Sequence, residues 1–241
     1  MAEIPLTSEA AFDTLLTSIA EDAVTASIHW RLCKDLFASV PEFVSELNDS
    51  PAFWSLTMNA HREVTLFRLG RLYDQQRGAL SLRSLVDTIA TNRHLFDVDR
   101  FRERLKGNPF VDSLADAARQ PDEATLVQDA NSVSEESDPL VKKLLAIRNR
   151  VLAHRDPRVV LGTVADPSQA LDPLDMDKLL ERASMVVNRY SSMFRAGTHA
   201  TWMFGGDDWK RVLGHVRDDL TARRAKLAAE IARAEDTPRT A

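Results

Sequence analysis

The sequence contains few of the residues on which several common protein classes depend. Cysteine occurs once in 241 residues, at Cys33, which excludes an internal disulfide and a cysteine-based zinc knuckle and is typical of a reducing compartment. Glycine occurs 8 times, well below its average usage of about 7%. This scarcity argues against glycine-rich phosphate loops and against the many tight turns of an all-β fold.

Long hydrophobic runs and metal-binding motifs are also missing. No apolar stretch reaches the roughly 20 residues of a membrane-spanning helix, and the first residues lack the basic start and apolar centre of a signal peptide. We therefore expect a cytoplasmic protein with no membrane partner. None of the 6 histidines has a glutamate three residues before it, and Walker and dinucleotide fingerprints are absent. We expect no metal site and no cofactor.

Apolar residues recur at steps of three and four along most of the chain, a pattern typical of amphipathic helices. It predicts helices over residues 8–39, 42–48, 52–76, 82–89, 97–107, 139–155, 173–203 and 207–234. In the third of these we expect a buried stripe of Phe53, Leu56, Ala60, Val64 and Phe67. The prediction is an all-α fold, an up-and-down helical bundle over 1–204 with an additional C-terminal helix and short tail over 205–241.

Charge is unevenly distributed around the middle of the chain. The formal net charge is −5, and residues 121–141 carry six acidic side chains and no basic one. From residue 142 to 158 the sign reverses, with six basic side chains opposed only by Asp156. We interpret the acidic stretch, about 118–138, as a surface insertion with few core contacts, and 158–172 as a loop. Two solvated faces of opposite sign are the alternative explanation.

Residues 139–155 hold an unusually placed arginine. On a helix, one apolar stripe is formed by Val141, Leu144, Leu145, Arg148, Val151, Leu152 and Arg155. A buried guanidinium without a partner would be very costly, so Arg148 needs a carboxylate partner, a water-filled cleft, a subunit interface or an anionic ligand. The mixture of apolar and basic residues suits a two-fold interface, and we expect a homodimer through this helix.

His154 follows Arg148 by six residues. In one ideal helix the two side chains point about 120° apart and lie about 9 Å apart along the axis. They would converge if the helix unwinds before Pro157, where the residue preceding proline disfavours helical geometry, or if a second protomer brings its own copy alongside. A surface histidine that interacts with the helix dipole is the alternative.

Residues 144–156, which read LLAIRNRVLAHRD, resemble the signature of the HEPN superfamily: an arginine, a polar residue, and a histidine after four to six positions. The chain resembles the AbiU-type abortive-infection branch, through RLGRLYD at 68–74 followed by the serine-capped SLRSL at 81–85. The similarity covers roughly residues 10–200.

The resemblance implies a helical bundle that dimerises with its motif helices face to face, and a metal-independent endoribonuclease of a defence or toxin–antitoxin system. Arg148 and His154 would be the catalytic pair and Asn149 their polar helper. The partners would be RNA and an antitoxin protein. Further contacts to RNA phosphates are expected from basic neighbours, namely Lys142, Lys143, Arg150 and Arg155.

The residue types suit this chemistry. Attack of a ribose 2′-OH on the adjacent phosphate needs a proton acceptor or donor with a pKa near 7, which histidine provides. It also needs a fixed cation for the charge of the transition state, which arginine provides. The alternative is a non-catalytic helical module that binds a protein or nucleotide, with Arg148 in an interface ion pair.

Overall fold

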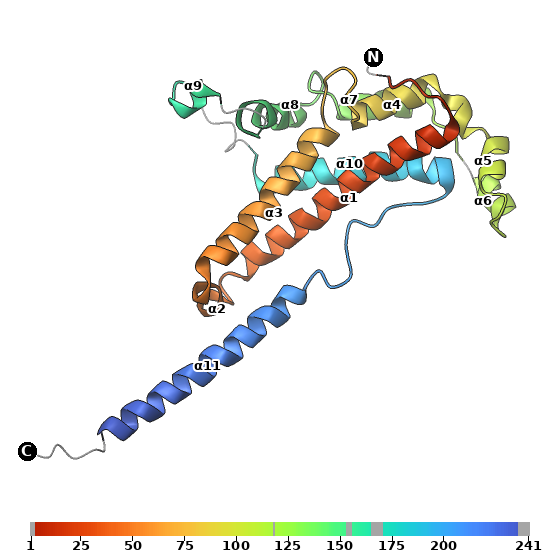
Figure 1. Cartoon of the computed structure of the whole chain (residues 1–241). Coiled ribbons are helices and arrows are strands. Elements are labelled where there is room, and N and C mark those ends of the chain that lie inside the picture. Colours follow the sequence, from red (N-terminus) through yellow and green to blue (C-terminus); the bar gives the residue numbers. More distant parts are fainter. Residues whose placement is uncertain (1–2, 118, 153–155, 165–170, 236–241) are drawn as a thin grey trace, which may run out of the picture. The chain divides into compact units, whose positions relative to one another are not determined.

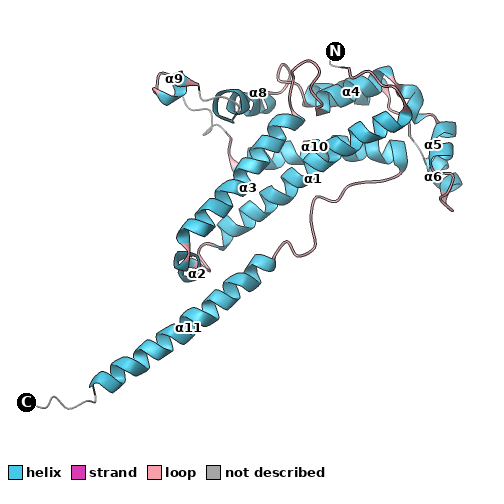
Figure 2. Ribbon diagram, viewed as in Figure 1, coloured by secondary structure: helices cyan, strands magenta, loops and turns pink. Residues whose placement is uncertain are grey.

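The computed structural model of the chain describes residues 3–117, 119–152, 156–164 and 171–235, and every regular element in these ranges is a helix (Figure 1). No strand occurs in this part of the chain (Figure 2), so the predicted all-α helical fold is confirmed. None of its helices is long and apolar enough to span a membrane. The elements, two of them short helices of other types, are α1 (Glu9–Ser39), α2 (Val44–Asp49), α3 (Pro51–Leu72), α4 (Leu82–Thr91), η1 (Arg93–Phe96), α5 (Val98–Arg104), α6 (Val111–Ala117), α7 (Glu123–Ser132), α8 (Pro139–Ile147), η2 (Arg148–Leu152), α9 (Pro157–Val160), α10 (Pro173–Arg195) and α11 (Asp208–Glu235).

The chain divides into two compact units, of which the first comprises residues 1–29 and 63–202. Its core contains three aromatic rings that pack edge to face, with the Phe12 and Phe194 centroids 4.9 Å apart and Phe96 against both. Edge-to-face contacts add to the stabilisation that burial of the rings provides. This unit contains α4 to α10 and therefore the candidate residues of α8.

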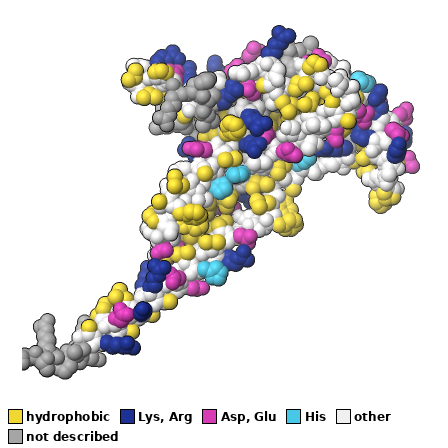
Figure 3. Space-filling view, in the orientation of Figure 1, with side chains coloured by type: hydrophobic (Ala, Val, Ile, Leu, Met, Phe, Trp, Pro, Cys, Tyr) yellow, Lys and Arg dark blue, Asp and Glu magenta, His cyan; other side chains and the backbone are white. Residues whose placement is uncertain are grey.

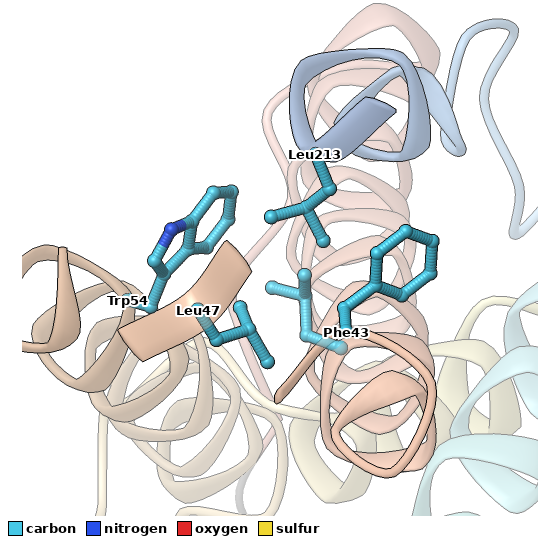
Figure 4. Packing of buried hydrophobic residues seen from close by; sticks show 5 residues of the cluster. Phe43, Leu47, Trp54 and Leu213 are labelled. Atoms are coloured by element: carbon cyan, nitrogen blue, oxygen red, sulfur yellow. The ribbon is translucent and has the colours of Figure 1, made fainter. Parts of the chain in front are cut away.

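The second unit comprises residues 30–62 and 203–241. The end of α1, α2, the start of α3 and α11 enclose a core of Leu36, Phe43, Leu47, Trp54 and Leu213 (Figure 4). The Arg217 guanidinium of α11 lies 4.6 Å from the centre of the Phe43 ring and pairs with Glu46 of α2. The division predicted from the sequence, 1–204 and 205–241, did not group residues 30–62 with the C-terminal helix.

Helix boundaries follow local sequence signals. Ser81 caps α4 through a reciprocal pair of hydrogen bonds with Ser84, as predicted. Asp172 caps α10 ahead of Pro173, where the predicted helix over 173–203 begins. The predicted helix over 173–203 ends earlier, because Ala196 has a left-handed backbone with φ of 54°. The predicted loop over 158–172 is wrong at its start, where α9 forms a single capped turn.

The predicted buried stripe of α3 is wrong. Phe53, Leu56 and Phe67 are 61%, 70% and 57% exposed. The buried side chains lie on the opposite side of the helix and include Trp54, Leu66, Leu69 and Leu72. Both sides of α3 are thus apolar, and among the described residues the core covers one of them.

The acidic stretch also differs from its prediction of few core contacts. Leu126 and Val133 are 3% and 0% exposed. The Asp129 carboxylate, itself buried, pairs with Arg189 and accepts a hydrogen bond of 2.8 Å from the Tyr190 hydroxyl. Residues of this stretch therefore form part of the core of the first unit rather than a loose surface excursion.

Candidate functional site

The start of α8 is fixed by Asp138. Its carboxylate accepts hydrogen bonds from the backbone N–H groups of Leu140 (2.8 Å) and Val141 (3.0 Å), and Pro139 stands in the first turn, where no helical hydrogen bond is lost. Arg182 of α10 contacts the same carboxylate at 2.9 Å. These bonds hold the helix against α10 before the candidate residues begin.

One side of α8 is buried within the chain. The buried residues are Val141, Leu144, Leu145 and Ile147. Lys142 and Lys143 occupy the exposed side. The apolar stripe that the sequence assigned to a subunit interface is therefore covered by the first unit itself, up to the position of Arg148.

The helix changes its geometry at Arg148. Residues Arg148–Leu152 form a turn with the wider, π-type hydrogen-bonding pattern, in place of the regular helix predicted over 139–155. Beyond it, the N–H of Asp156 donates to the carbonyl of Arg150 at 3.0 Å. Turns of this type are rare in proteins, and those that occur are often found at functional sites.

The Arg148 side chain lies across the end of α3. Its Nη2 is 2.5 Å from Asp74 Oδ2, and its Nη1 donates to Asn149 Oδ1 at 2.9 Å. Its aliphatic stem passes so close to Gly70 that a Cβ there would be 3.0 Å from Arg148 Cγ. Because the Arg148 side chain is 22% exposed, the guanidinium lies between a nearly buried carboxylate and the surface.

Asp74 is held in place by its neighbours. The Tyr73 hydroxyl donates to a backbone carbonyl of α10 at 2.7 Å, and burial raises the pKa of Tyr73, so this donor stays protonated. The Gln75 side chain donates to the carbonyl of the residue after α7 at 3.0 Å. The N–H of Gln76 donates to the second Asp74 oxygen at 2.9 Å. The segment after α3 is thus anchored to two other helices.

Sequence reasoning required a partner for Arg148 but did not identify it. Asp74 entered only as the last residue of the RLGRLYD segment. The available signal was the position of an arginine on an apolar stripe, which demands a carboxylate or another compensating environment. With 36 acidic residues in the chain, that requirement does not select one.

The predicted site residues have different surroundings. Asn149 and Arg150 are exposed, whereas Lys143 lies 3.6 Å from Asp175 and is partly neutralised. His154 and Arg155 lie outside the described residues. Of the predicted catalytic residues, the structure therefore brings together Arg148 and Asn149.

Potential metal ligands do not cluster in the described ranges: no group of three or more histidine, cysteine, aspartate or glutamate side chains there is arranged to hold a metal ion. His154 is not among the residues to which this observation applies. A site that works without metal therefore stays a prediction.

Comparison with known protein families places the candidate site in a family. The sequence model of the HEPN AbiU2 family matches residues 9–220. The match includes Asp74, Arg148, Asn149 and His154, as well as the first part of α11. No curated protein and no solved structure matches the chain.

Proposed function

Because the chain belongs to the AbiU2 family of HEPN abortive-infection proteins, we propose that it is a cytoplasmic, metal-independent endoribonuclease. It would act as an effector of phage defence or as the toxin of a toxin–antitoxin pair. Arg148 and His154 are the proposed catalytic pair, and Asn149 is their polar helper.

In the proposed reaction the ribose 2′-oxygen attacks the adjacent phosphorus and the bond from phosphorus to the 5′-oxygen breaks. His154 takes the proton of the 2′-OH or delivers one to the leaving 5′-oxygen. The Arg148 guanidinium stabilises the added negative charge on the phosphate oxygens. The products are a 2′,3′-cyclic phosphate and a free 5′-hydroxyl.

The observation that supports the proposal most is the arrangement of the Arg148 guanidinium. Asp74 and Gly70 fix its position from the inner side, and the Asn149 amide oxygen fixes it from the outer side. A guanidinium has five N–H donors, and two of its nitrogens have partners among the described residues. The remaining donors suit a phosphate, because arginine binds phosphate oxygens through paired hydrogen bonds.

Substrate and protein partners are part of the proposal. Lys142, Lys143, Arg150 and Arg155 would contact RNA phosphates around the cleaved bond. A second protomer would face the side of the motif helix that carries Asn149 and Arg150, since the opposite side of α8 is buried. An antitoxin protein would restrain the activity by covering the same surface.

A second candidate function rests on the same ion pair. Because Asp74 already neutralises Arg148, the pair is also compatible with a non-catalytic module that binds a protein or nucleotide. In that case Arg148 would stabilise the fold. Truncating it would then cost about 3–5 kcal/mol, the usual effect of leaving one partner of a buried pair alone.

The test is incubation of the purified full-length protein with total RNA in EDTA. We expect cleavage with 2′,3′-cyclic phosphate ends, and a loss of at least about 100-fold for Arg148→Ala and for His154→Ala. Lys226→Ala, on exposed α11, is the matched control and should cleave normally. Absence of cleavage by the wild type, combined with a large fall in melting temperature for Arg148→Ala, would support the binding module instead.

A further inference from the structure

Helix α3 has an apolar face that is exposed in the described part of the structure. The face consists of Phe53, Leu56, Ala60, Val64 and Phe67, of which Val64 is partly exposed and the others are exposed. At 3.6 residues per turn, all five point within about 40° of one direction on this single continuous helix. Figure 3 shows hydrophobic side chains gathered on the surface along which α1 and α3 run. Exposed apolar patches of this kind commonly mark interaction sites.

The sequence of this face is nearly a palindrome. Counted outward from Ala60, an aliphatic residue follows after four positions on each side, and a phenylalanine after three more. The spacings are therefore 3, 4, 4 and 3, and the side chains grow from the centre to both ends. Within 53–67 the only lysine, arginine, aspartate or glutamate residues are Arg62 and Glu63, one of each sign.

We propose that a second copy of this chain binds to this face, with the two α3 helices antiparallel and the two-fold axis at Ala60. A two-fold interface joins the same patch on both protomers, so the patch has to be complementary to itself. An antiparallel pair centred on Ala60 places Phe53 opposite Phe67 and Leu56 opposite Val64. An apolar stripe whose side chains are not matched in size about a central residue lacks this property.

The size of the side chains fits the geometry of crossing helices. Packed helices lie 8–10 Å apart, and the closest approach requires small residues at the crossing point. Ala60 provides such a residue. Away from the crossing the two helices diverge, and the larger Leu56 and Val64, and then the two phenylalanines, fill the widening space. The face extends over about 21 Å at a rise of 1.5 Å per residue.

The exposed area predicts a weak association. Phenylalanine side chains bury about 150–250 Å² each, so Phe53 and Phe67, at 61% and 57% exposure, offer roughly 200–300 Å² per protomer. Even with the aliphatic residues, the contact falls in the class below about 1,200 Å², which is typical of weak or transient interfaces. Assembly through α3 should therefore depend on protein concentration.

This interface is separate from the proposed contact between motif helices. Antiparallel pairing about Ala60 sets the two copies of Gly70, and with them the two Arg148 side chains, about 30 Å apart along the helix axis. The α3 contact therefore does not depend on catalysis. A chain with two different two-fold faces forms a closed tetramer or an open array, and the α3 face contributes one of the two association steps.

Cysteine cross-linking tests the register. In a Cys33→Ala background, Ala60→Cys should form a disulfide-linked dimer under mild oxidation, because the two-fold axis brings position 60 against its own copy. Leu56→Cys alone should not link, whereas Leu56→Cys with Val64→Cys should. Efficient linking by Leu56→Cys alone, or none by Ala60→Cys, would overturn the proposed pairing.

Analytical ultracentrifugation over a concentration series tests the association itself. Ala60→Arg sets two like charges against each other and should halve the mass of the assembly at high concentration. Ser55→Arg, an exposed position on another side of α3, should leave the mass unchanged. Equal masses for wild type and Ala60→Arg, with unchanged melting temperatures, would refute the interface. RNA cleavage assayed in parallel keeps this result distinguishable from failure of the proposed function.

Discussion

Two arginines of nearly equal exposure have different sets of partners in the described part of the first unit. The Arg195 side chain, at the end of α10, is 23% exposed, and that of Arg148, after α8, is 22% exposed. All three nitrogens of the Arg195 guanidinium have a partner: Nη1 donates to Asp13 and Thr17, Nε to Ser191, and Nη2 to His199. Arg148 contacts Asp74 and Asn149.

The two arginines are almost equally buried but differ in how many of their hydrogen-bond donors have a partner among the described residues. Burial alone would assign both side chains the same role. Arg195, however, connects α1, α10 and the segment after α10, and each nitrogen of its guanidinium donates a hydrogen bond within that connection. Arg148 is held by one carboxylate and one amide. The carboxylate is that of Asp74, just after α3, and the amide is that of Asn149, the next residue in the chain. Among the described residues, only Nη1 and Nη2 of the Arg148 guanidinium have a partner, and under the proposed function the remaining donors would bind a phosphate.

The largest expected effect is on stability. Arg195→Ala removes several hydrogen bonds of a charged group at once, and we expect it to lower the free energy of unfolding by about 2–3 kcal/mol. Arg148→Ala should cost about 1 kcal/mol, because its guanidinium reaches the surface and Asp74 keeps the hydrogen bond from Gln76. Urea denaturation of both variants measures the difference.

Equal losses in the two variants would contradict the comparison and support the non-catalytic function of Arg148. Lys210→Ala, on exposed α11 of the second unit, is the control: it removes a cation that lies outside the first unit. Its unfolding free energy should lie within about 0.5 kcal/mol of the wild type.

The sequence predicted the helical elements well where a cap or a proline marks the boundary, as for Ser81 and for Asp172 with Pro173. It failed on α3 because that helix has two apolar sides, and periodicity alone does not say which one meets the core. The pairing of Asp74 with Arg148 joins residues 74 positions apart. Such a contact depends on how the fold brings the end of α3 to the turn that begins at Arg148, which no local pattern encodes.

Gly70→Ala should change the stability less than the arginine variants do, but it should displace the Arg148 side chain. Alanine favours the helix over glycine by up to about 1 kcal/mol. The added Cβ, however, would lie 3.0 Å from Arg148 Cγ and 3.4 Å from its Cβ, so the arginine has to move. The gain and the strain should nearly cancel in the melting temperature. If the proposed function holds, cleavage should fall at least about 10-fold, because misplacing a catalytic group is costly.

Gly214→Ala is the matched control, since a Cβ at this helical glycine meets no atom within 4 Å. It should raise the melting temperature and leave cleavage unchanged. If Gly70→Ala stabilised the protein as much as Gly214→Ala and kept full activity, the close packing on Gly70 would have no role in positioning Arg148.

The smallest effect concerns the pH dependence of the Arg195 cluster. His199 Nε2 faces the Arg195 guanidinium at 3.0 Å and the Ser191 hydroxyl at 3.3 Å, and Asp13 reaches the same arginine from α1. Burial and then the charge of Arg195 lower the pKa of His199 below its usual 6.5. The unfolded chain therefore binds this proton at a higher pH than the folded chain. The contribution to stability is complete above pH 6.5 and is lost as the pH falls toward the lowered pKa.

His199→Gln keeps an acceptor but cannot titrate, so its melting temperature should fall less than that of the wild type between pH 7.5 and 5.5. Parallel curves for the two proteins would show that His199 is not coupled to Arg195.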